Sequence, residues 1–431
     1  MLGSSRRGFL AGSAALPATT ALARVPEDLA ARVAGDLDRY IGFGSKQAGG
    51  VGDRACGAWL TGELEGLGFK VEQQPVSVPY FVPERCELSC GTTRANVWPQ
   101  PIVVPTGSQG ASGPLVRIDG TGRPAGSLAG AVALLDLPFA RYSTAIAKPV
   151  RVPIEAAFAA GAVAVVVITN GPTGKVIALN ADGRKPMFAG PVALLAPSDA
   201  GPFLAAAIRG DKATLVLTGE GGRRPADNFI GRLDRGRKSW VAVSTPRSGW
   251  YGCAGERGGG VAAWLWLARW ASKAVTGHNL AFICNSGHEY ENLGAAEALK
   301  ATAPRPEDTH FWLHLGANVA AQDWHDLTGQ VLPGIDTQRY LSVTPGLLPL
   351  ARAIFAGHVG LEAPYSSETI SAGEQIEILA AGYRNVAAVF GIHRHHHVVD
   401  DDRRCVSAAN VAKTAHGFQR LLERAAALDP R

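Results

Sequence analysis

The chain lacks the features that mark membrane-spanning and disordered proteins. Outside the N-terminal segment, no uninterrupted apolar run reaches the roughly 18 residues that a membrane helix needs. Charged residues make up only 18% of the 431 residues and apolar residues 46%, which excludes general disorder. The length predicts about two to three globular domains.

Cysteine is also sparse, with six residues in the whole chain. A chain this long does not need disulfides to fold, although an exported protein permits them. The spacing of the cysteines does not reveal any pairing, and we assign them no role in metal binding.

The N-terminal segment is typical of a twin-arginine export signal. Arg6 and Arg7 precede Phe-Leu and a mildly apolar stretch, and residues 21–23 (Ala-Leu-Ala) offer a cleavage site. We therefore expect residues 1–23 to be removed and the mature protein to be periplasmic or secreted. Removal takes away two arginines and no acid, so the formal net charge falls from +5 to +3. A charge that small implies no nucleic-acid partner.

The mature chain begins with a pattern of helix, helix and strand. Apolar residues recur at helical spacing over residues 26–41 and 56–67, and residues 69–72 alternate as a strand. The segment Pro-Tyr-Phe-Val-Pro at residues 79–83 is then expected to break regular structure.

Residues 85–225 have a different composition, with short Val-rich strands, many glycines and few charges. A helix at residues 154–160 precedes Gly-Ala-Val and an apolar strand that ends at Asn170. This pattern resembles the protease-associated domain, although any small α/β insertion remains an alternative. The basic cluster at residues 223–238 is expected to be a solvated linker.

Longer elements return after residue 228. Strands are expected at residues 240–244, 280–284, 311–315 and 385–390, and helices at 261–274, 293–299, 347–356 and 406–428. Because strands and helices alternate, we predict an α/β fold with a mixed, mostly parallel sheet covered by helices on both faces.

Three loops at strand ends carry residues suited to metal binding. Glu256 and Glu289 each follow a predicted strand, and His397 lies in a His-rich run after another. In an open α/β sheet, ligands bind beyond the carboxyl ends of the strands. Two carboxylates and one imidazole can hold a single zinc ion and leave a position for water. A solvated turn and a solvated His-rich loop are the alternatives.

Residues 24–431 resemble the zinc-dependent aminopeptidases that carry an inserted protease-associated domain, a superfamily that includes glutaminyl cyclase. Residues 254–261 (Ala-Gly-Glu-Arg-Gly-Gly-Gly-Val) match the loop whose Asp bridges two zinc ions, with Glu256 in its place. Ser-Gly-His-Glu, ending at Glu289, matches Asp-Gly-Glu-Glu, and His397 matches the last zinc ligand. The resemblance implies a catalytic domain of residues 24–84 and 226–431, interrupted by the insertion at residues 85–225.

The departures from the family pattern imply one zinc ion rather than two. Thr245 and Arg247 replace a ligand His and an Asp, and Gly316 replaces an Asp ligand of the second ion. His288 stands where the family has its general-base Glu, and Glu374 takes the position of another Asp.

These positions suggest roles for the remaining residues. An imidazole titrates close to neutral pH, so His288 is the expected proton carrier. Arg247 is the best candidate to hold a substrate carboxylate, followed by Tyr290, His395 and His396. A structural ion pair between Arg247 and Glu256 is the alternative.

Three functions remain open. The first is an exported hydrolase of the aminopeptidase type that acts on a small peptide, aminoacyl or amide substrate with one metal ion. The second is a non-peptidase enzyme on the same fold, either cyclase-like or with metal-free acid–base chemistry led by His288 and Glu289. The third is an inactive homologue that binds peptides.

Overall fold

A computed structural model describes residues 26–428 of the chain. The predicted export signal at residues 1–23 lies outside the described residues. No helix in the described part is long and apolar enough to cross a membrane.

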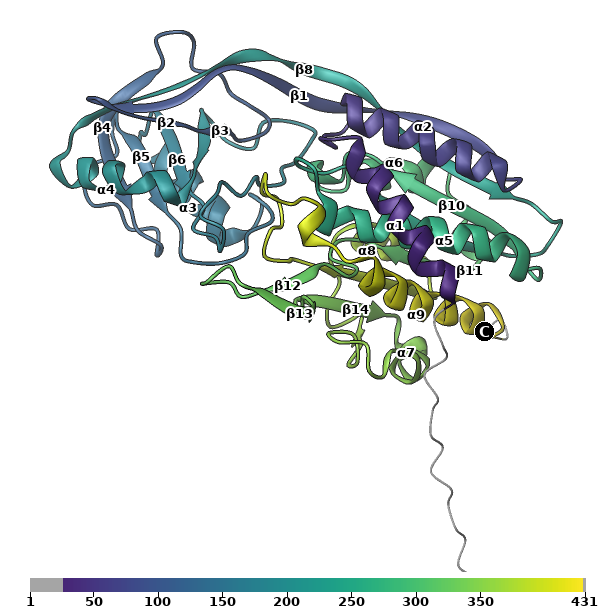
Figure 1. The fold of residues 1–431 in the computed structure, drawn as a ribbon. Coiled ribbons are helices and arrows are strands. Elements are labelled where there is room, and N and C mark those ends of the chain that lie inside the picture. Colours follow the sequence, from purple (N-terminus) through teal and green to yellow (C-terminus); the bar gives the residue numbers. More distant parts are fainter. Residues whose placement is uncertain (1–25, 429–431) are drawn as a thin grey trace, which may run out of the picture.

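The larger body is built on a mixed sheet (Figure 1). Its central strands are parallel and lie in the order β16 (Val386–Gly391), β11 (Thr309–Leu315), β9 (Trp240–Pro246) and β10 (Asn279–Asn285). Antiparallel strands flank them, β8 (Lys212–Leu233) beside β10 and β14 (Arg339–Val343) beside β16, with β15 (Tyr365–Ser366) at the edge. The predicted α/β fold with a mostly parallel sheet is confirmed.

Helices cover both faces of this sheet because its strands are apolar on both sides. Along β10, Leu280 and Phe282 belong to one core, whereas Ala281 and Ile283 belong to the other. The first core is covered by α1 (Glu27–Gly42), α2 (Val51–Gly66), α5 (Gly259–Ala274), α7 (Leu348–Phe355) and α9 (Ala408–Ala426). The second is covered by α6 (Leu293–Ala301) and α8 (Glu374–Ala380).

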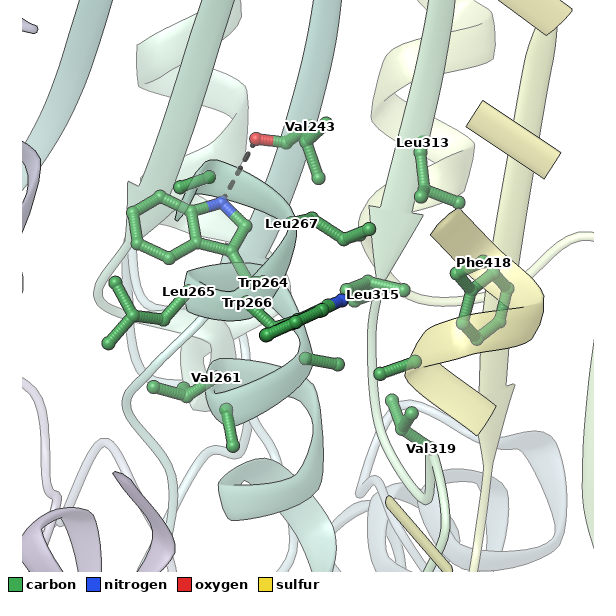
Figure 2. Packing of buried hydrophobic residues seen from close by; sticks show 14 of the residues in the cluster. Val243, Val261, Trp264, Leu265, Trp266, Leu267, Leu313, Leu315, Val319 and Phe418 are labelled. Carbon is green, nitrogen blue, oxygen red and sulfur yellow. Dashed lines mark hydrogen bonds between the residues drawn. The ribbon is translucent and has the colours of Figure 1, made fainter. Parts of the chain in front are cut away.

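The centre of the first core is α5, which the sequence predicts to be buried. The ring of Trp264 is fully buried, and its indole N–H donates to the carbonyl of Val243 on β9 at 3.1 Å (Figure 2). Leu313 and Phe418 bring β11 and α9 into the same core. One helix therefore links the sheet to the C-terminal helix.

The insertion forms a smaller α/β body, whose strands continue the sheet through the antiparallel pairing of β8 with β4. Its parallel strands are β4 (Ala111–Ile118), β5 (Val132–Asp136), β6 (Ala164–Ile168) and β7 (Val192–Leu195), and β3 (Trp98–Pro99) pairs with β7. On β6, Val166 faces α4 (Ala200–Arg209) and Val167 faces α3 (Lys148–Ala159). Short hairpin strands complete the chain, β2 (Thr93–Asn96), β12 (Gln322–Trp324) and β13 (Val331–Ile335).

A long two-stranded ribbon joins the two bodies, and it corrects two predictions (Figure 1). The segment at residues 79–83 does not break regular structure, because β1 (Lys70–Cys90) runs through it and pairs with β8 from end to end. In this stretch β8 is the only partner of β1, so the missing N–H groups of the prolines can face the unpaired edge. Likewise, Arg223, Arg224 and Arg232 lie on β8 rather than in a linker.

We predict that Trp264→Ala lowers the free energy of unfolding by about 3–5 kcal/mol, because it opens a cavity in the core and removes a buried hydrogen bond. Urea denaturation of the purified protein measures this change. Ile208→Ala is the control, since that side chain is 86% exposed on α4 and its loss should cost less than about 0.5 kcal/mol. Equal losses in the two variants would contradict the prediction.

Candidate active site

Loops at the carboxyl ends of the central strands surround a cavity of about 500 Å³. His288 follows β10, His314 lies near the end of β11, and His396 follows β16. The insertion contributes Ser143 and Asn180 to the same cavity. Residues far apart in the sequence therefore meet where the fold predicts a ligand site.

The turn that carries His288 is held by close backbone packing. Gly287 adopts a φ of +81°, which disfavours any residue with a Cβ. At Gly294 an added Cβ would lie 1.8 Å from the carbonyl oxygen of Ser286, so α6 packs directly against the turn. This packing directs η3 (His288–Tyr290) toward the cavity.

His288 contacts Glu374 at the start of α8. His288 Nδ1 lies 3.3 Å from Glu374 Oε1, and Asn285 donates to Glu374 Oε2 at 3.0 Å. Burial lowers the pKa of His288, whereas these partners hold the pKa of Glu374 below its usual value despite burial. The pair is therefore a neutral imidazole hydrogen-bonded to a carboxylate.

Glu256 and His397 also meet, in a second cluster that includes His396. His397 Nε2 lies 3.1 Å from Glu256 Oε1, and one ligand atom from each of the three residues lies within 4.8 Å of the others. His397 Nδ1 is 2.9 Å from the carbonyl oxygen of Ala178. This is the one group of three potential metal ligands found within residues 26–428.

Asp401 positions the loop that carries Glu256. Its carboxylate accepts the backbone N–H groups of Gly255 and Glu256, at 2.7 and 3.0 Å, and contacts His393 Nε2 at 3.3 Å. The loop is a single π-helical turn, residues Ala254–Gly258, that leads into α5. The buried carboxylate thus fixes the backbone from which Glu256 projects.

Arg257 places a positive group against Glu256. Its guanidinium lies 2.7 Å from Glu256 Oε1, and both side chains are fully buried. Burial would raise the pKa of Glu256, but Arg257 and His397 hold it well below its usual value. Glu256 is therefore a carboxylate that is already paired with the guanidinium of Arg257.

Glu289 lies apart from this cluster. Its buried carboxylate accepts a hydrogen bond from the backbone N–H of Ala48 at 2.7 Å and another from the hydroxyl of Ser248 at 2.7 Å. Burial raises its pKa. These contacts tie the turn to two neighbouring loops, so the structure does not bring Glu289 together with Glu256 and His397.

Arg247 is buried away from the cavity that His288 lines. It pairs with Asp53 at 2.9 Å and donates to the carbonyl of Asp227 at 2.6 Å. The alternative ion pair with Glu256 does not form, because Arg247 pairs with Asp53 on α2 instead. Arg247 lines a different, smaller cavity together with Asp227 and Phe229.

Sequence reasoning missed Arg257, Asp401 and the role of His396 as a neighbour of Glu256. Each had a signal in the sequence, because Arg257 directly follows Glu256 and His396 directly precedes His397. Asp401 ends the segment that contains His397. What the sequence could not supply was the direction in which each side chain points.

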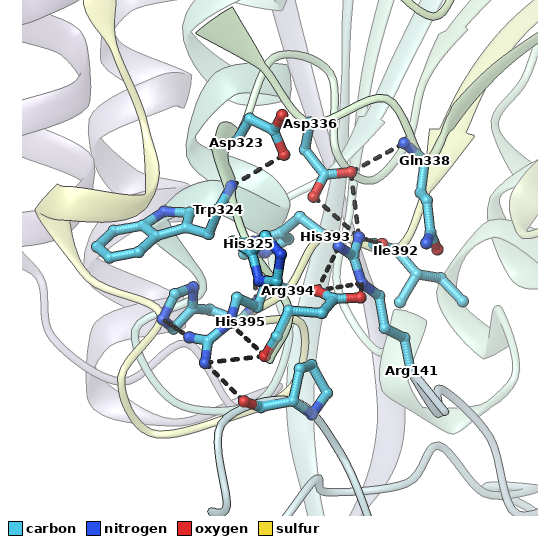
Figure 3. Close-up of polar contacts among 12 residues, drawn as sticks. Arg141, Asp323, Trp324, His325, Asp336, Gln338, Ile392, His393, Arg394 and His395 are labelled. Atoms are coloured by element: carbon cyan, nitrogen blue, oxygen red, sulfur yellow. Dashed lines mark hydrogen bonds and ion pairs between the residues drawn. The ribbon is translucent and has the colours of Figure 1, made fainter. Parts of the chain in front are cut away.

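An ionic clamp holds the insertion against the cavity (Figure 3). Arg141 contacts Asp326 at 2.7 Å and Asp336 at 2.8 Å, and it donates to the carbonyl of Ile392 at 2.8 Å. The nearby Ser143 lies 3.2 Å from His396 Nε2. The clamp therefore keeps a polar loop of the insertion at the mouth of the site.

No known family profile and no curated protein matches the chain. Several solved structures, however, are similar to the chain. The zinc aminopeptidase BSAP from Bacillus subtilis is 17% identical, with a TM-score of 0.71 over 93% of this chain and 96% of that one. A peptidase M28 precursor from Shewanella amazonensis SB2B is 18% identical, with a TM-score of 0.72 over 94% of this chain and 97% of that one.

An aminopeptidase from Aneurinibacillus sp. strain AM-1 is similar to the same extent. It is 18% identical, with a TM-score of 0.66 over 92% of this chain and 95% of that one. An overlap that covers 92% of this chain includes both of its bodies. The chain has the fold of the zinc aminopeptidases.

Proposed function

We propose that the protein is a hydrolase of peptide or amide bonds that acts with one zinc ion. Glu256, His396 and His397 would hold the ion, and His288 with Glu374 would carry the proton. One observation carries the proposal: His288 and His396 line the same cavity, so the acid–base pair and the candidate ligands border one space. In line with the N-terminal pattern, the protein would work outside the cytoplasm.

His288 is suited to act as a general base. Because its Nδ1–H can donate to Glu374, its Nε2 carries the free lone pair, and this atom has no hydrogen-bond partner within residues 26–428. A water molecule in the cavity can give a proton to Nε2, and the imidazolium can pass it to the leaving amine. The carboxylate of Glu374 stabilises that imidazolium.

The candidate ligands fit zinc chemically. Two imidazoles and one carboxylate form a zinc set found in hydrolases. Glu256 Oε2 and His396 Nδ1 are buried and have no hydrogen-bond partner among the described residues. The contact of His397 Nδ1 with the carbonyl oxygen of Ala178 orients the ring so that its Nε2 faces the carboxylate of Glu256. When bound, zinc would polarise a substrate carbonyl or activate water.

The cavity walls suggest the kind of substrate. Tyr340, Ile370, Ile376 and Phe390 form an apolar wall, and Ser143 of the insertion adds a polar group. Such a site can receive an apolar side chain next to the bond to be cleaved. A small peptide or an aminoacyl amide satisfies both requirements. The insertion, which we take to be a protease-associated domain, would cover the substrate.

A second candidate function is metal-free acid–base chemistry on the same fold. It is favoured by Arg257, whose guanidinium already neutralises Glu256 at 2.7 Å. A fixed positive charge there repels a second cation. In this case His288 and Glu374 would perform the reaction with Arg257 as the positive group of the site.

Metal analysis separates the two candidates. We predict about one zinc ion per chain in protein exported by its native route, with loss of the ion in Glu256→Gln and in His397→Gln. Glu289→Gln is the matched control, because its contacts with Ala48 and Ser248 lie outside the ligand group, and it should keep the metal. If the wild type holds no stoichiometric metal and chelators leave its activity intact, zinc is excluded and the second candidate stands.

The acid–base pair is tested by kinetics on aminoacyl amides and N-terminal glutaminyl peptides. We predict that His288→Ala lowers kcat/KM by about 10²- to 10⁴-fold and that Glu374→Gln has a smaller effect in the same direction. Glu297→Gln, an exposed change on α6, should leave kcat/KM unaltered. Normal rates in His288→Ala would remove this residue from the mechanism.

His314 lies next to Glu374 of the His288–Glu374 pair, and its imidazole is neutral near pH 7. Its Nδ1 is 2.9 Å from the hydroxyl of Ser244 and 3.8 Å from Glu374 Oε2. Burial lowers the pKa of His314 to about 4. Between about pH 4 and 6.5 the unfolded chain therefore binds a proton that the folded chain does not, and stability rises with pH across this window.

We accordingly predict a pH-dependent effect of His314→Gln. Between pH 7 and pH 5, protonation of His314 in the unfolded chain should lower the unfolding free energy of the wild type by about 2 kcal/mol. The variant lacks this imidazole and should not show that loss. Urea denaturation at both pH values measures the difference between the two proteins. Parallel losses in wild type and variant would show that His314 is not the titrating group.

A further inference from the structure

Two neighbouring residues at the end of the His288 turn adopt a backbone conformation that residues with a side chain rarely take. Glu291 has a φ of +49° and Asn292 a φ of +60°. This left-handed region is less unusual for Asn than for Glu, and such residues cost about 1–3 kcal/mol each and gather at functional sites. The backbone N–H groups of both donate to the carbonyl oxygen of His288, that of Asn292 at 3.2 Å, which holds the conformation.

Both side chains face the candidate active site. Glu291 and Asn292 line the same cavity of about 500 Å³ as His288. Asn292 is only 8% exposed, and its side-chain amide keeps accessible surface but bonds to no group within residues 26–428. Because the rest of Asn292 is buried, this amide points into the cavity. Amides in buried residues rarely lack a partner, so the position indicates a ligand.

Glu291 supplies the one full charge on the cavity wall. No other Asp, Glu, Lys or Arg is found among the described residues that line the cavity. Burial lowers the pKa of the three histidines there, His288, His314 and His396, so they are neutral near pH 7. One carboxylate oxygen of Glu291 accepts the hydroxyl of Thr144, whereas the other bonds to no group in the described part of the chain. The negative charge is therefore available to a ligand.

These two residues suit a primary ammonium group. An ammonium has three N–H donors and no acceptor, and its hydrogen bonds to a carboxylate are among the strong ones. Glu291 offers a carboxylate oxygen and Asn292 an amide oxygen from adjacent positions of one turn. Neither belongs to the candidate zinc ligands. Two side-chain oxygens are also too few for Ca²⁺, which takes about six to eight.

We propose that Glu291 and Asn292 bind the α-ammonium group of the substrate and thereby determine which bond is presented to His288. This inference rests on the proposed hydrolase function. The two residues share one turn with His288, and an α-ammonium is joined to the first carbonyl through a single carbon atom. A lysine ammonium stands at the end of a flexible four-carbon stem and would hold that carbonyl farther from the base. The subsite thus selects the free amino end of a peptide or an aminoacyl amide.

Calorimetry on the full-length protein tests the subsite with compounds that carry an alcohol in place of the carbonyl to be attacked. L-leucinol has the free α-ammonium, N-acetyl-L-leucinol has it blocked, and Nα-acetyl-L-lysinol has an ammonium on the side chain only. We expect L-leucinol to bind about tenfold more tightly than either blocked compound. Equal affinities for L-leucinol and its acetyl form, or tighter binding of the lysinol, would overturn the proposal.

Variants separate recognition from a structural role. Glu291→Gln can still accept the Thr144 hydroxyl but has no charge, so it should weaken L-leucinol binding about tenfold and leave N-acetyl-L-leucinol binding unchanged. Asn292→Gly suits the left-handed backbone and should weaken L-leucinol binding about threefold. Glu297→Gln is the matched control, because Glu297 pairs with Lys300 outside the cavity and should bind normally.

The subsite and the hydrolase proposal fail in different ways. Selective binding of L-leucinol by a protein that cleaves no amide substrate would remove the hydrolase and leave the ammonium subsite in place. Unchanged L-leucinol affinity in Glu291→Gln, in a protein that cleaves amino-blocked substrates as fast as free ones, would overturn the subsite and leave the hydrolase.

Discussion

The site depends on one constraint, which is that charges at the ends of the central strands are buried and each needs a partner. Burying an unpaired charge costs several kcal/mol, and removing one member of a buried pair costs about as much. The chain meets this requirement in two ways: Asp53 pairs with Arg247, Glu256 with Arg257 and Asp401 with His393, whereas Glu374 and Glu289 are held by hydrogen bonds from neutral groups. Which pairs form decides which side chains remain free for chemistry.

This pairing explains how the site departs from the arrangement that the family resemblance implies. Arg247 is used by Asp53 and stays out of the cavity, and Glu289 holds its turn through Ala48 and Ser248. Among the groups that line the cavity are His288, which contacts Glu374, and His396, which lies beside Glu256 and His397.

Much of the fold could be predicted from the sequence, because burial on both faces leaves a continuous apolar run in β10 and β11, and helical spacing marks α1 and α9. The ribbon could not, since Pro79 and Pro83 break strands in most contexts and their tolerance here depends on an unpaired edge. The location of the candidate site could be predicted from the ends of the strands. The contacts between its side chains could not be predicted, because the direction of Arg257 and the partner of Arg247 are set by residues far away in the sequence.

The ribbon and the Arg141 clamp attach the insertion to the larger body, and hydrogen bonds of Ala178 with His397 and of Asn180 with Trp250 add further points. A body held at several points forms a closed frame, and it can swing away only if the ribbon bends and these contacts are released together. Entry to the cavity is then governed by the shape of the frame rather than by a hinge. If the protein is the hydrolase proposed above, a frame of this kind would favour chain ends and small molecules over the middle of a folded protein.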